Sequence, residues 1–149
     1  MMRISQIIIT IICLLLSNSA FAASANEEAR VIANVKKAFE TKQAQPILDL
    51  YYWKGVSKKD RAKVSKSITL MVNSKGQITS IQFIGPKPNG LTEIVRAGVT
   101  YRINLPITKR LEIKFKPKGD ANFKNTSTSR FNVGEKNGKL YFVQLAPVK

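Results

Sequence analysis

The chain contains no histidine and a single cysteine, Cys13, which lies within the apolar run Ile7–Leu16 near the N-terminus. If this segment is removed, no disulfide can form, so the fold must depend on an ordinary hydrophobic core. The same absences exclude a cysteine nucleophile, a histidine general base and the usual zinc ligands. The sequence therefore predicts no cofactor and no metal site, and any catalysis would use Asp, Glu, Lys, Tyr or Ser side chains.

Residues 1–22 have the pattern of a cleaved signal peptide. Arg3 supplies a positive start, and the apolar run Ile7–Leu16 is too short to span a bilayer. The segment ends in Ala20-Phe21-Ala22, the small-x-small pattern of a cleavage site. We therefore predict cleavage following Ala22, a periplasmic or extracellular location, and one domain over residues 23–149. The alternative is an uncleaved membrane anchor.

Acidic residues are few. The chain has 25 Lys and Arg against 9 Asp and Glu, a net charge of +16 that becomes +15 when Arg3 leaves with the leader. Such a surplus attracts polyanions and anionic membrane surfaces. Export argues against nucleic acid and favours anionic lipid, lipopolysaccharide, a wall polymer or an envelope protein as the partner. The alternative is that the charge serves solubility alone.

The first half of the domain, about residues 26–67, has helical patterns. Pro46 and Gly55 are typical of the start and the end of a second helix, and a third begins at Ser57. The first helix, about residues 26–41, is predicted by apolar residues at i, i+4, i+7 and i+8, namely Val31, Val35, Ala38 and Phe39.

From residue 68 to about 146 the apolar period is two, which predicts strands. The runs "ITLMVN" (68–73) and "ITSIQFI" (78–84) are separated by Ser74-Lys75-Gly76, a hairpin signal. Residues 85–90, "GPKPNG", have the composition of a loop.

The clearest alternation covers residues 99–105 and 110–116, which predicts two paired strands with one apolar and one cationic face. A last hairpin pairs about 129–133 with 139–146 across "GEKNG". Helices followed by strands predict an α+β fold, with N-terminal helices packed on a curved antiparallel sheet of five or six strands.

The order of these elements, the chain length and the helical segment "FETKQAQPILDLYYWKGVS" resemble small members of the nuclear-transport-factor-2-like (SnoaL-like, cystatin-like) superfamily. The resemblance covers most of residues 26–146 and concerns architecture rather than a tight motif. It implies a cone-shaped, cystatin-like roll with a pocket between the helices and the concave sheet. Some relatives use that pocket for catalysis with an acid and a tyrosine, and many only bind ligands or proteins. This chain lacks the histidine of various enzymatic members.

The stretch "LDLYYWKG" contains the one tryptophan and two of the four tyrosines. As a helix it would be apolar nearly all round, which is typical of a buried segment. The alternative is that its side chains line a pocket, namely Leu48, Tyr51, Tyr52 and Trp53. Asp49 has apolar neighbours, so burial could raise its pKa toward the general-base range, with Tyr51 or Tyr52 as partner. Otherwise Asp49 faces water near the helix N-terminus.

The cationic face of the predicted strand pair is the candidate anion-binding surface, formed by Arg102, Lys109, Arg110, Lys114 and Lys116. A second basic cluster between Lys54 and Lys66 fits a solvated helix face. We therefore expect an exported, non-enzymatic binding or accessory domain that contacts an anionic or amphipathic envelope partner. The alternatives are a small pocket enzyme with an Asp/Tyr acid–base pair, and a module that docks to another protein.

Overall fold

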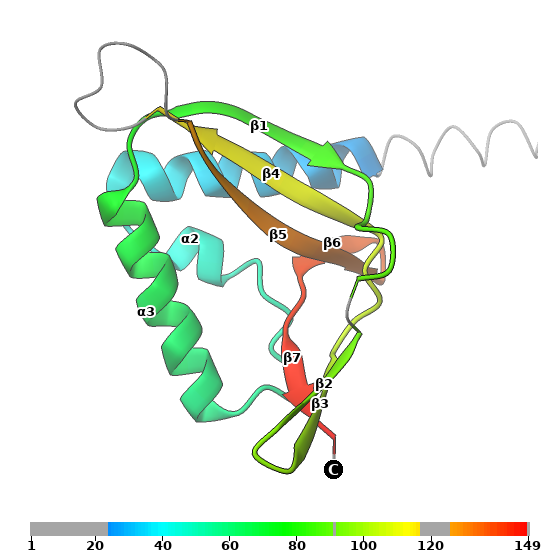
Figure 1. The fold of residues 1–149 in the computed structure, drawn as a ribbon. Helices are drawn as coiled ribbons and strands as arrows, with labels where there is room; N and C mark the ends of the chain where they lie inside the picture. The colour runs from blue at the N-terminus through cyan, green and yellow to red at the C-terminus, as the bar shows by residue number, and fades with distance from the viewer. Residues whose placement is uncertain (1–23, 91, 117–125, 149) are drawn as a thin grey trace, which may run out of the picture.

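The computed structural model describes residues 24–90, 92–116 and 126–148, and Figure 1 shows their arrangement. The helices are residues 24–41, α2 (Gln45–Leu48) and α3 (Lys58–Ser74). None of these helices is long and apolar enough to cross a membrane. The predicted signal peptide lies outside the described residues.

The strands form two antiparallel sheets, so the predicted α+β class is confirmed. The sequence predicted a single curved sheet, whereas the strands divide into a four-stranded and a three-stranded sheet. The larger sheet has the order β1-β4-β5-β6, with strands Ile78–Ile84, Lys109–Phe115, Ser127–Lys136 and Lys139–Phe142. The smaller sheet has the order β2-β3-β7, with strands Glu93–Arg96, Val99–Ile103 and Leu145–Pro147.

The core lies between the helices and the four-stranded sheet. The predicted first helix is confirmed, and its apolar positions Val31, Val35, Ala38 and Phe39 are buried. In β4 the side chains alternate, so Leu111, Ile113 and Phe115 face the core while the charged residues between them face outward. The rings of Phe39 and Phe115 lie 5.2 Å apart and join the helix to the sheet.

Residues 68–73 belong to α3, so the predicted strand there is wrong. The helix begins at Ser57, whose Oγ accepts a hydrogen bond from the Asp60 amide (3.1 Å). Ile68, Leu70 and Val72 fit a strand as well as a helix, but only Ile68 and Val72 are buried, while Leu70 is 59% exposed. A spacing of four residues places Ile68 and Val72 on the same face of a helix, where both are buried. This packing favours the helix over a strand, and α3 runs without a break to Ser74.

The second helix is shorter than predicted. It ends at Leu48, Asp49 and Leu50 form a turn, and Tyr51 then makes an isolated parallel bridge with Phe142 of β6. The Phe142 amide donates to the Leu50 carbonyl (2.7 Å), and the Tyr52 amide donates to the Phe142 carbonyl (2.9 Å). The helix prediction was wrong beyond Leu48 because an extended segment satisfies the edge of β6, which a longer helix could not do.

The predicted pairing of residues 99–105 with 110–116 is also wrong. β3 pairs with β2 through a two-residue turn in which Ala97 and Gly98 have positive φ (47° and 76°). β4 lies between β1 and β5, so both its edges are occupied. The linker between β3 and β4 crosses β5, where Pro106 lies against Gly134.

Three other predictions are confirmed. β1 occupies residues 78–84, and residues 85–90 contain neither helix nor strand. β5 and β6 form a hairpin at the predicted place, closed by Asn137 and Gly138 with φ of 53° and 73°. The predicted strand 139–146 is too long, because β6 ends at Phe142 and Leu145–Pro147 forms β7, which pairs with β3.

Candidate functional site

The aromatic residues of "LDLYYWKG" belong mainly to the core. Tyr51 is buried, its ring stacks on Trp53 at 4.9 Å and meets Phe142 edge-on at 5.4 Å. Trp53 is partly buried, and its indole N–H donates to the Leu48 carbonyl (3.1 Å). Burial raises the pKa of the Tyr51 hydroxyl, which makes this group a poorer acid–base catalyst at neutral pH than an exposed tyrosine. Tyr52 is partly exposed beside Tyr141.

Asp49 does not lie in an apolar pocket. It is exposed at the end of α2, where the Gln45 side-chain amide donates to its Oδ1 (2.6 Å). The acid–base hypothesis required a buried carboxylate beside a tyrosine hydroxyl. The structure does not bring Asp49 together with Tyr51 in that way, since Tyr51 is buried in the core.

The predicted cationic face is divided between the two sheets. Arg102, on β3, pairs with Glu93 (2.7 Å), whereas Lys109 points to the helix side of β4 and pairs with Glu28 (2.6 Å). The remaining residues of the set lie on the outer side or at the end of β4, namely Arg110, Lys114 and Lys116. These five side chains therefore do not form one anion-binding surface.

A carboxylate neutralises the outer side of β4. Glu112 is only 6% exposed, and its oxygens accept hydrogen bonds from Arg130 (2.8 Å) and Gln82 (3.2 Å). Lys114 approaches the same carboxylate at 3.7 Å. The hydrogen bond from Arg130 lowers the pKa of the Glu112 carboxyl, against the opposing effect of desolvation. Cross-strand pairing brings Arg130 and Gln82 to Glu112, and no local sequence pattern indicates that.

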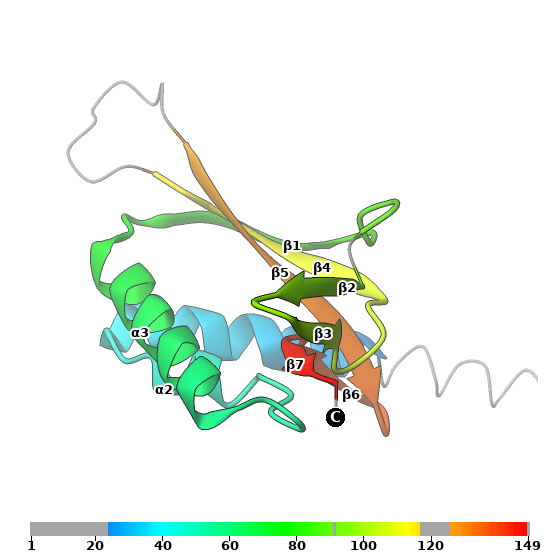
Figure 2. The same cartoon turned by 60° about the horizontal axis from the view of Figure 1, so that its bottom comes forward.

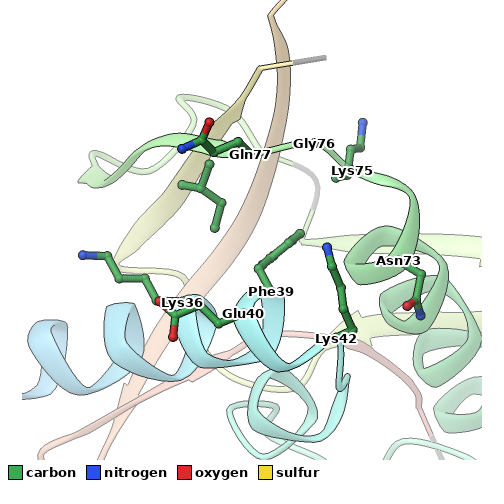
Figure 3. Close-up of a pocket in the computed structure, with 9 residues that line it drawn as sticks. Lys36, Phe39, Glu40, Lys42, Asn73, Lys75, Gly76 and Gln77 are labelled. Carbon is green, nitrogen blue, oxygen red and sulfur yellow. The ribbon is translucent and has the colours of Figure 1, made fainter. Parts of the chain in front are cut away.

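One cavity opens where three segments meet (Figure 3): the end of the helix 24–41, the end of α3 and the start of β1. Its volume of about 610 Å³ is in the range of small-molecule sites. Phe39 and Ile78 make the buried or half-buried apolar part of its wall. The rest of the wall consists of polar or charged residues and one glycine, namely Lys36, Glu40, Lys42, Asn73, Lys75, Gly76 and Gln77.

Lys42 occupies an unusual backbone position in this wall. It follows the end of the helix with φ of 57°, and the Gln43 amide donates to the Ala38 carbonyl (3.1 Å), as in a Schellman motif. Glycine is the residue usually found there, because an L side chain is strained at positive φ. Figure 3 shows the side chains of Phe39 and Lys42 extending toward the same part of the cavity. The Lys42 ammonium donates to the Val72 carbonyl at the end of α3 (3.3 Å).

Lys75 and Lys36 complete the positive rim. The Lys75 ammonium donates to Ser127 Oγ (3.2 Å) and lies 5.8 Å from the centre of the Phe115 ring. Among the described residues, neither these two lysines nor Lys42 forms an ion pair with a carboxylate. Among the described residues of the wall, Glu40 is the one that is acidic. Lys36 and Lys42 lie at the end of the helix 24–41, whereas Lys75 follows α3, so no sequence pattern links Lys75 to the other two.

A second cavity, of about 510 Å³, lies between the loop after β1 and the small sheet, with Ile103, Pro106 and Asn132 in its wall. None of Leu48, Tyr51, Tyr52 and Trp53 lines either cavity. In the part of the chain that the structure describes, no group of three His, Cys, Asp or Glu residues is placed to hold a metal ion.

Comparison with protein-family models, curated proteins and solved structures found no match.

Proposed function

We propose that this protein is an exported, non-catalytic binding domain that holds an anionic, partly apolar ligand in the cavity rimmed by Lys36, Lys42 and Lys75. The observation that carries the proposal is the composition of this wall, whose described residues include three lysines, one carboxylate and two apolar side chains, Phe39 and Ile78. Such a wall attracts a negatively charged group and offers apolar contact to the rest of the ligand.

Two further features support the proposal. The large positive net charge raises the local concentration of anions around the whole molecule. The ammonium groups of Lys42 and Lys75 are held by neutral oxygens, and each has N–H donors left for a ligand. The resemblance to the nuclear-transport-factor-2-like roll supports the proposed architecture. The predicted signal peptide supports the proposed export.

The competing explanation is structural. Two helices end at this cavity, and lysines near helix C-termini offset the negative end of the helix dipole. On that explanation, loss of Lys36 and Lys42 changes the stability of the protein and no ligand is involved.

Calorimetric titration of the protein from residue 23 onward with octyl phosphate separates the two explanations, with octanol as the uncharged comparison. We expect octyl phosphate to bind, and its affinity to fall as salt rises. The double variant Lys36→Gln/Lys42→Gln should weaken binding about a hundredfold, since each of the two lost charge-assisted hydrogen bonds contributes about 1.5 kcal/mol.

The matched control is Lys37→Gln/Lys66→Gln, which removes two exposed lysines outside the cavity and should leave the affinity unchanged. Equal losses in the two double variants, or no octyl phosphate binding by the unmodified protein, would show that the cavity is not an anion site.

A further inference from the structure

The three-stranded sheet exposes apolar side chains at one end. No residue of β2, β3 or β7 is fully buried. Among the described residues four large apolar side chains stand out as exposed, and three of them, Val95, Val99 and Val148, belong to this sheet or follow it directly. Their exposed fractions are 68%, 40% and 44%. Figure 1 shows the β2–β3 hairpin extending away from the four-stranded sheet, with the C-terminal end of the chain beside it.

The hairpin tip is apolar on both faces. Val95 lies opposite Thr100, and the Val148 amide donates to the Thr100 carbonyl (2.8 Å), which places both valines beside Thr100. Val99 is adjacent to Thr100 in β3, so its side chain projects from the opposite face. A partner protein that packs on one face of the sheet would cover only some of the three valines, Val95, Val99 and Val148. An interfacial lipid layer would surround the whole tip.

The tip carries a cation and no acid. Arg96 lies opposite Val99 at the turn, and Ala97 and Gly98 close that turn without a bulky side chain. The nearest acidic residue on the hairpin is Glu93, which is paired with Arg102 at the base (2.7 Å). The apolar tip therefore has a positive margin.

Three exposed lysines border the same sheet. The Lys54 carbonyl accepts a hydrogen bond from the Asn104 side chain just after β3 (3.2 Å), which fixes this segment beside the sheet. Lys58 and Lys59 follow at the start of α3, and both are exposed. Figures 1 and 2 agree that the N-terminal end of α3 and the small sheet lie at the same end of the molecule.

We infer that this end of the protein docks onto an anionic phospholipid bilayer. Val95, Val99 and Val148 enter the interfacial layer, and Arg96 with Lys54, Lys58 and Lys59 contacts the phosphate groups. Apolar insertion and electrostatic attraction add in such binding, and each basic residue near an anionic surface strengthens it about fivefold. This inference is independent of the cavity, which lies between other elements.

The test is co-sedimentation of the protein, from residue 23 onward, with vesicles of phosphatidylcholine, with and without phosphatidylglycerol. We expect binding only to the phosphatidylglycerol vesicles. Lys58→Gln/Lys59→Gln should weaken it about twentyfold at low salt. Val95→Ser/Val99→Ser should weaken it at least tenfold at the same low salt concentration, although it leaves the charge unchanged.

The matched control is Leu70→Ser, which removes an exposed apolar side chain from α3 and should bind as the unmodified protein does. Circular dichroism establishes that each variant is folded. Equal binding to both vesicle types, or unchanged binding by Val95→Ser/Val99→Ser, would overturn the inference. A dimer detected by light scattering would also overturn the inference, if the protein does not bind vesicles and Val95→Ser/Val99→Ser abolishes the dimer. The tip would then be a protein–protein contact.

Discussion

The carbonyl of Pro106 occupies the space that a side chain at residue 134 would need. A Cβ built on Gly134 would overlap that oxygen and lie 2.9 Å from Leu105 Cδ2. The linker that leads from the small sheet to β4 crosses β5 at this point. Because residue 134 is glycine, the linker can pass close to β5 here and connect β3 of the small sheet to β4 of the large one.

We expect Gly134→Ala to lower the free energy of unfolding by about 1–3 kcal/mol, because the clash involves backbone that cannot move aside cheaply. Urea denaturation measures the change. Gly85→Ala is the control, since its Cβ would meet nothing within 4 Å, and it should be within about 0.5 kcal/mol of the unmodified protein. Equal stability of the two variants would mean that the linker is free to move off β5.

How much of the fold could be predicted depended on whether a signal was local. The first helix, predicted over about residues 26–41, and the turn between β5 and β6 were predicted correctly, because an apolar repeat and an Asn-Gly pair are local signals. Residues 68–73 fit both periods, and only tertiary packing decides that Leu70 faces water.

Strand pairing and the candidate site needed information that the sequence does not carry locally. Alternation in residues 99–105 and 110–116 marked strands correctly but not their partners, since β3 turns back on β2 through an Ala-Gly turn. The rim of the cavity combines Lys36, Lys42 and Lys75 only because two helix ends meet the start of β1.

Lys42→Gly tests whether a lysine at positive φ serves binding rather than stability. Glycine relieves a strain of about 1 kcal/mol, and loss of the part-buried hydrogen bond from the Lys42 ammonium to the Val72 carbonyl costs about 1–1.5 kcal/mol. Because the two effects nearly cancel, we expect the melting temperature to stay almost level and the affinity for octyl phosphate to fall. A clearly lower melting temperature with unchanged affinity would show that Lys42 only caps α3.

Glu112 should make the protein less stable in acid. Arg130 lowers the pKa of Glu112 in the folded state below the unfolded value of about 4.5. The resulting stability is present above pH 4.5 and is lost as the pH falls through the lower folded pKa. Thermal melts between neutral pH and pH 3 should therefore fall less steeply for Glu112→Gln and for Arg130→Gln than for the unmodified protein. Parallel curves for all three would contradict the proposed interaction.

Tyr51 should matter for packing and not for its hydroxyl chemistry. Tyr51→Ala removes a ring that contacts both Trp53 and Phe142, and should lower the free energy of unfolding by about 3–5 kcal/mol. Tyr51→Phe keeps the ring and should change stability by less than about 1.5 kcal/mol at neutral pH. The raised pKa of Tyr51 adds stability that is present below the unfolded pKa of 10.0 and is lost as the pH rises beyond it. The unmodified protein should thus lose stability above pH 10 more steeply than Tyr51→Phe, and identical alkaline melting curves would show that the Tyr51 hydroxyl reaches water.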